Sequence, residues 1–223
     1  MRSVGVVPIA VVFAALTAGC GGTATPTPKT TQTVQVNPAQ TESAWILKQE
    51  MRKLWTDHVV WTRSYIIAAL GGTPDASAAA DRLMRNQEDF GNAVAKYYGS
   101  AAGEQLTTLL KQHISIAVDV IAAAKAGNKA GLKEADDRWQ QNAVQIADFL
   151  SQANPNWPRA TLIDMMKTHL STTTAEVDAR LAKAWNDDVK AFDAVYDHIL
   201  SLSDTLSEGI VKQFPDKFET VSN

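Results

Sequence analysis

Apolar residues recur every three or four positions through almost the whole chain from Ser43 onward, and this periodicity constrains the fold most strongly. No window alternates polar and apolar residues at period two, so we expect no β-sheet. Short connections between long amphipathic helices are typical of antiparallel neighbours. The sequence therefore predicts an all-α, up-down helical bundle of about six helices, with breaks at 71–72, 99, 127–128 and 154–158.

The last third of the chain is harder to divide into helices. Thr173 followed by Glu176 matches a capping box, so we expect a short fifth helix to end near Leu170 and a sixth to begin near Thr174. A sixth helix of about forty residues is long for a globular protein. We therefore expect it to bend near Trp185.

A weak internal repeat underlies this pattern. His58, His113 and His169 are spaced by 55 and 56 residues, each well inside a predicted helix. The segments 81–86 and 137–142 share Asp-Arg, a large apolar residue, and Asn three positions later. These matches predict duplication of a helical hairpin about 57 residues long. We expect the third copy to be remodelled, because its first helix would be short.

The first twenty residues have the character of a bacterial export signal. Arg2 is followed by an apolar stretch from Val4 to Leu16, which is too short to span a bilayer. Ala18-Gly19 then precede Cys20, the only cysteine. This pattern resembles the lipobox of bacterial lipoproteins, which implies a signal peptide over 1–19 and a Cys20 thiol that carries a diacylglyceryl group, with acyl chains such as palmitate.

The remaining chain divides into a tether, a domain and a tail. Residues 20–42 are rich in threonine and proline and poor in large apolar side chains, so we expect a disordered tether. Residues 43–218 would form the helical domain and 219–223 a short tail. We expect no later apolar run to span the membrane. The lipid would therefore be the sole anchor, on the extracytoplasmic face of the cell membrane.

Charge and motif content argue against several function classes. The chain has 21 Lys and Arg against 24 Asp and Glu and lacks a basic block, so we expect no nucleic-acid partner. The motifs of serine hydrolases, zinc proteases, P-loop proteins and dinucleotide-binding proteins are also absent. We therefore expect no enzyme activity and no cofactor.

Four histidines, His58, His113, His169 and His198, are the candidate site residues, because each lies on or beside an apolar helix face. Imidazoles on the inward faces of one bundle can meet around a metal or flank a haem. Alternatively, each could hydrogen-bond a carboxylate or carbonyl. The spacings of helical metal sites are absent, so we favour the structural interpretation and assign no metal.

Two amides, Asn86 and Gln87, fall on a part of the second helix that should be apolar. Buried amides need hydrogen-bond partners, so we expect contacts with Arg82 or a histidine. We interpret the pair as residues that fix helix pairing rather than as a ligand site.

Four short sequence motifs resemble those of a group of short, uncharacterised all-helical bacterial proteins. They are Asn86–Ala93, Tyr97–Gly99, Asn154–Trp157 and Gln213–Pro215. The resemblance extends over about residues 54–218 and implies a helical fold. No activity is established for that group, so the resemblance carries no functional residue.

The sequence thus predicts a lipid-anchored helical module outside the cytoplasm that binds an envelope protein, an envelope component or a small molecule. The alternative is a metal- or tetrapyrrole-binding bundle that uses His58, His113 and His198, with His169 as a further candidate. An enzyme without a recognisable motif is the third interpretation.

The lipid anchor gives the first testable prediction. In Cys20→Ala, the protein should leave the membrane fraction or remain unprocessed, because no thiol can be acylated. Thr23→Ala, in the tether, is the matched control and should stay membrane-bound. Cell fractionation with immunoblotting measures both properties, and normal processing with membrane retention in Cys20→Ala would contradict the prediction.

Overall fold

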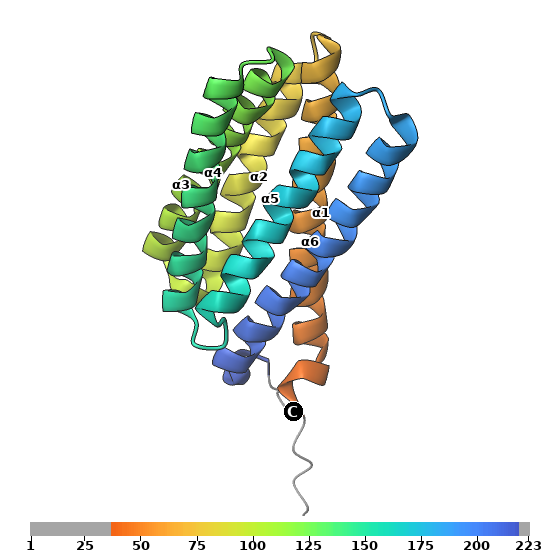
Figure 1. Ribbon diagram of the computed structural model, residues 1–223. Helices are drawn as coiled ribbons and strands as arrows, with labels where there is room; N and C mark the ends of the chain where they lie inside the picture. The colour runs from red at the N-terminus through yellow and green to blue at the C-terminus, as the bar shows by residue number, and fades with distance from the viewer. Residues whose placement is uncertain (1–36, 219–223) are drawn as a thin grey trace, which may run out of the picture. The chain divides into compact units, whose positions relative to one another are not determined.

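The computed structural model describes residues 37–218, and this part of the chain contains six α-helices and no strand (Figure 1). The all-α bundle expected from the sequence is confirmed. The helices are α1 (Glu42–Gly71), α2 (Ala76–Tyr98), α3 (Ser100–Lys125), α4 (Lys129–Ala153), α5 (Arg159–Leu181) and α6 (Trp185–Gln213), with 3-10 turns η1 (Pro38–Gln40) and η2 (Pro215–Lys217).

The helices run alternately up and down, and each packs against the next one in the sequence (Figure 1). The loops between them are short, which favours such neighbours. Helix α6 also packs against α1, so the six helices form a closed ring. Helix α1 touches α3 and α5 as well, and the rings of His113 on α3 and His169 on α5 lie 6.1 Å apart, so the three odd-numbered helices approach one another inside the bundle.

One large apolar core runs through the bundle and receives side chains from every helix. Burial of one large apolar side chain contributes about 1.5–3 kcal/mol to the free energy of unfolding. The stability of the fold therefore depends on many such contributions. Representative buried residues, one from each helix in order, are Leu47, Phe90, Leu110, Ile146, Leu170 and Ile199.

The expected division of the last third was wrong. Helix α5 continues through Thr173, whose hydroxyl donates to a carbonyl oxygen within the same helix (2.8 Å). Glu176 binds Arg63 of α1 (2.6 Å) instead of closing a capping box. The helices instead separate at Lys183, which adopts the left-handed conformation (φ 56°) two residues before α6 begins at Trp185. Since no glycine marks this turn, the pattern of breaking residues could not locate it.

The described bundle begins before the expected boundary at Ser43. Thr41 is buried, and its hydroxyl accepts a hydrogen bond from the backbone N–H of Ala44 (3.3 Å), which caps α1. Residues 37–42 therefore belong with the domain. The predicted signal peptide, Cys20, the rest of the tether and the C-terminal tail lie outside the described residues.

We expected no apolar segment after the signal peptide to be able to span a membrane, but α3 is long and apolar enough to do so. Among the described helices it alone has the length and apolar composition of a membrane span. In the bundle it packs between α2 and α4, and Leu110 and Ile114 are buried in protein. The core helix of a bundle has the same character, so composition alone is weak support for a span.

Three of the four sequence motifs that carry the family resemblance meet at one end of the bundle. Tyr98 donates a hydrogen bond to the side-chain oxygen of Gln213 (2.8 Å) and accepts one from the side-chain amide of Asn154 (2.9 Å). Trp157 packs so closely on Gly209 that a Cβ there would overlap the indole ring. These motifs therefore have a structural role, because they join the ends of α2, α4 and α6.

Candidate functional site

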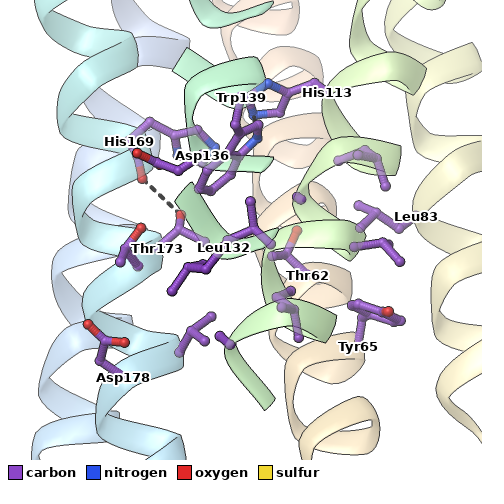
Figure 2. Close-up of a pocket in the computed structure, with 18 of the residues that line it drawn as sticks. Thr62, Tyr65, Leu83, His113, Leu132, Asp136, Trp139, His169, Thr173 and Asp178 are labelled. Atoms are coloured by element: carbon purple, nitrogen blue, oxygen red, sulfur yellow. Dashed lines mark hydrogen bonds between the residues drawn. The ribbon is translucent and has the colours of Figure 1, made fainter. Parts of the chain in front are cut away.

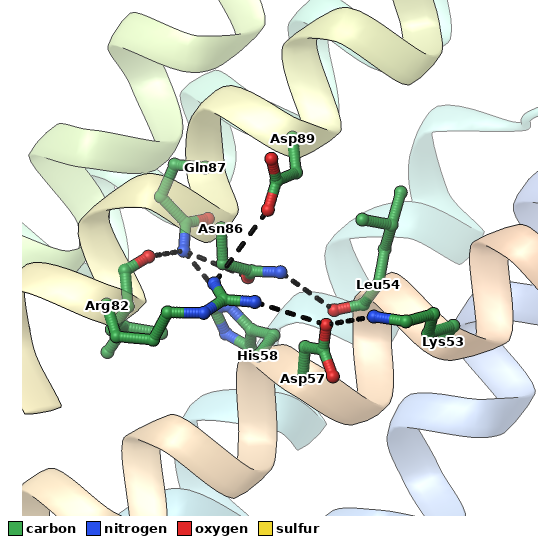
Figure 3. A network of polar contacts seen from close by, with 9 residues as sticks. Lys53, Leu54, Asp57, His58, Arg82, Asn86, Gln87 and Asp89 are labelled. Atoms are coloured by element: carbon green, nitrogen blue, oxygen red, sulfur yellow. Dashed lines mark hydrogen bonds and ion pairs between the residues drawn. The ribbon is translucent and has the colours of Figure 1, made fainter.

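The predicted repeat is visible as one hydrogen bond that recurs between paired helices. In α1 and α2, the side-chain amide of Asn86 donates to the carbonyl oxygen of Leu54 (3.1 Å; Figure 3). In α3 and α4, Asn142 donates to the carbonyl oxygen of Leu109 (3.2 Å). Each acceptor lies four residues before a repeated histidine. Asn86 therefore joins α1 to α2 through the carbonyl oxygen of Leu54, as expected of a residue that fixes helix pairing. Asn86 also contacts His58, and this contact opposes the lowering of the His58 pKa by burial.

In the third helix pair, α5 and α6, a different residue type makes the equivalent hydrogen bond. His198 Nε2 donates to the carbonyl oxygen of Met165 (2.9 Å), four residues before His169. Asn86, Asn142 and His198 are each 56 residues apart, so His198 occupies the position of the two asparagines. The third copy is therefore changed at this position, and the expected shortening of its first helix was wrong.

The four histidines lie close together in the centre of the bundle. The ring centroid of His169 lies 5.7 Å from that of His58, 6.1 Å from that of His113 and 6.3 Å from that of His198. His58, His113 and His169 are buried and come from α1, α3 and α5. We call these three residues the histidine layer. Within residues 37–218, no group of three or more His, Cys, Asp or Glu has the geometry to hold a metal ion.

His113 is neutral and uses both of its ring nitrogens. Its Nδ1 lies 2.7 Å from Asn142 Oδ1, and Trp139 Nε1 donates to its Nε2 at 3.1 Å. An indole nitrogen can only donate, so Nε2 accepts and Nδ1 carries the proton. Burial lowers the pKa of His113 to about 4. His113 therefore has no nitrogen free for a metal.

His58 is also neutral. The side-chain nitrogen of Gln87 lies 3.5 Å from His58 Nδ1 and donates to the carbonyl oxygen of Leu83 at 2.7 Å (Figure 3). The same nitrogen of Gln87 also donates to Asn86 Oδ1 at 3.2 Å, so both of its hydrogens are used and its contact with His58 does not fix the tautomer of that ring. Burial and then the nearby His113 lower the pKa of His58 to about 3. The expected contact between Gln87 and a histidine is thus confirmed.

His169 differs from the other two members of the histidine layer. Its Nδ1 is buried and has no hydrogen-bond partner. Burial and then the neighbouring imidazoles lower its pKa well below the usual value, so the ring is neutral. An unpaired buried polar group costs about 1–3 kcal/mol, and such groups are rare in native proteins. Nothing in the sequence distinguishes His169 from His113 in this respect.

A cavity of about 410 Å³, which we call the main cavity, lies beside the histidine layer (Figure 2). The layer forms its floor, and its walls are largely apolar side chains of α1 to α5. The exposed Lys129 and Lys133 of α4 and Asp178 of α5 mark its mouth. Small-molecule sites in proteins have volumes of about 300–1,000 Å³, so this cavity has a suitable size.

The histidine layer separates the main cavity from a second, smaller one. This second cavity has a volume of about 40 Å³ and apolar walls, which include Met51 and Leu206. All three histidines of the layer line both cavities. Among the buried side-chain atoms without a partner in residues 37–218, only His169 Nδ1 belongs to a residue that lines the main cavity.

A separate ionic cluster joins α1, α5 and α6. Arg63 contacts Glu176 (2.6 Å) and Asp188 (3.0 Å), and Arg180 contacts Asp188 (2.9 Å). Both carboxylates are buried, and burial raises the pKa of Glu176 to about 7 although Arg63 opposes the shift. Neither carboxylate lines the two cavities, so we interpret the cluster as a structural join between helices.

Comparison of the chain with protein-family models, with curated proteins and with solved structures finds no match. The resemblance to uncharacterised all-helical bacterial proteins therefore stays a prediction.

Two matched substitutions distinguish the roles of the histidines. His113→Leu should lower the free energy of unfolding by about 2–5 kcal/mol, because Trp139 Nε1–H and Asn142 Oδ1 lose their buried partner. His169→Leu should lower it by less than about 1 kcal/mol, because an unpaired polar group is removed. Urea unfolding of residues 21–223 at pH 7, followed by circular dichroism, measures both. Equal losses in the two variants would contradict these assignments.

Proposed function

We propose that this chain is a lipid-anchored, extracytoplasmic binding module that holds a small, largely apolar molecule in the main cavity. One observation carries the binding part of the proposal: the unpaired buried nitrogen of His169 lies in a residue on the floor of that cavity. Protein interiors are close-packed, and their buried polar groups are nearly all hydrogen-bonded. Other buried atoms of residues 37–218 also lack a partner, but only at His169 does an unpaired nitrogen occur in a residue that lines the main cavity. This combination supports a binding site rather than a packing defect.

The chemistry of the cavity supports binding rather than catalysis. A general base works best when its pKa lies near the operating pH. The pKa values of His58 and His113 are lowered to about 3 and about 4, so these groups accept protons poorly near neutral pH. The apolar walls also suit a molecule that partitions into the cell envelope, where the predicted lipid on Cys20 would keep the protein.

The metal- or tetrapyrrole-binding alternative is less well supported. It needs imidazole nitrogens that are free to ligate, and His113 uses one to donate to Asn142 and the other to accept from Trp139. His198 uses its Nε2 on a backbone carbonyl. Hydrogen bonding therefore accounts for His113 and His198, and repetition places His58 and His169 beside them.

A cavity-filling substitution tests the proposed function. Naphthalene at about ten times its dissociation constant should stabilise the protein by about 1.4 kcal/mol, which raises the melting temperature by about 3–6 °C. Thr174→Trp places an indole in the cavity wall and should remove this shift. Thr168→Trp, exposed on the same helix, is the control and should keep it.

Differential scanning fluorimetry of residues 21–223 measures the melting temperatures. The absence of a naphthalene-dependent shift in the wild type, or an unchanged shift in Thr174→Trp, would contradict the proposed function.

A further inference from the structure

The polar and charged groups of the main cavity are unevenly distributed. Its floor is the histidine layer, which is neutral. The charged residues that line it are Lys129, Lys133, Asp136 and Asp178 of α4 and α5, and Lys133 is paired with Asp137 (2.6 Å). Among the described residues, none of these charged groups makes an ion pair or hydrogen bond with the histidine layer. A ligand group at the floor therefore meets neutral imidazoles.

The three imidazoles differ in what they can offer to a ligand. His113 is fully used by Asn142 and Trp139. His58 has its Nδ1 directed at the side-chain nitrogen of Gln87, at 3.5 Å. His169 alone has a buried nitrogen without a partner, and its ring centroid is 5.7 Å from that of His58. His169 is thus the member of the layer that gains most from a new hydrogen bond.

We infer that the ligand of the main cavity carries one neutral hydrogen-bonding group, a hydroxyl or a carbonyl, which binds His169 beside the His58 ring. This inference rests on the proposed function and adds the chemical class of the ligand. A neutral imidazole donates from one nitrogen and accepts at the other, so it can bind either group. The rest of the ligand is apolar, because the walls around it are apolar.

A negatively charged group does not suit this floor. A carboxylate buried there would lose its hydration without gaining a counter-ion. Protonation of an imidazole could supply one, but burial disfavours the charged form of all three histidines. A carboxylate analogue should therefore bind more weakly than an uncharged one of the same size.

Three probes of nearly equal size test this inference: naphthalene, 1-naphthol and 1-naphthoate. At pH 7 the naphthol is uncharged and the naphthoate is an anion, and the ring system is shared. For residues 21–223, fluorescence titration should give 1-naphthol an affinity about 3- to 10-fold higher than that of naphthalene, as expected for one net hydrogen bond. The 1-naphthoate affinity should be the lowest of the three.

Two variants locate the effect. His169→Leu should bring the affinities of 1-naphthol and naphthalene within about twofold of each other, because the hydrogen-bonding partner is lost. His198→Asn is the matched control, since asparagine occupies the equivalent position in the other two repeats. It should keep the preference for 1-naphthol, because His198 does not line the main cavity.

The outcomes separate this inference from the proposed function. Equal binding of 1-naphthol and naphthalene by the wild type, a preference that survives in His169→Leu, or tightest binding of 1-naphthoate would each overturn the inference alone. Failure of naphthalene to bind, or naphthalene binding that persists in Thr174→Trp, would overturn the proposed function as well.

Discussion

The arrangement of this bundle depends on one hydrogen bond that is made three times. A side chain on each even-numbered helix donates to the carbonyl oxygen that lies four residues before a histidine on the preceding helix. The donors are Asn86, Asn142 and His198. This contact fixes the shift of each even-numbered helix against its odd-numbered partner. The three repeated histidines hold equivalent positions on α1, α3 and α5, and their rings meet at the centre of the bundle. The histidine layer is therefore a consequence of the repeat.

The layer combines a structural role with a cost in stability. His113, with both nitrogens bonded, contributes to the join between α3 and α4. His169 stands at the same position of its own repeat but has a buried nitrogen without a partner. Native proteins commonly accept such a cost where a site must bind something. The difference between two equivalent residues, together with the adjoining main cavity, therefore favours His169 as the ligand-binding member.

The helical periodicity and the glycine breaks were sufficient to predict six helices and a repeated hairpin, since both depend on local patterns. The boundary between α5 and α6 could not be predicted, because Lys183 adopts a conformation that usually indicates glycine. The equivalence of His198 with Asn142 was detectable in their 56-residue spacing, but the change of residue type concealed it. No pattern in the sequence predicted the main cavity, because its volume depends on how side chains from five helices pack against one another.

The protonation states of the histidines test the central claim most directly. Long-range ¹H–¹⁵N correlation spectra across a pH series report the charge and the tautomer of each imidazole. All three members of the histidine layer should stay neutral down to about pH 5, below the usual histidine pKa of about 6.5. His113 should carry its proton on Nδ1, because Trp139 donates to its Nε2. A charged imidazole in the layer at pH 6, or the opposite tautomer at His113, would contradict the hydrogen-bond arrangement on which the site depends.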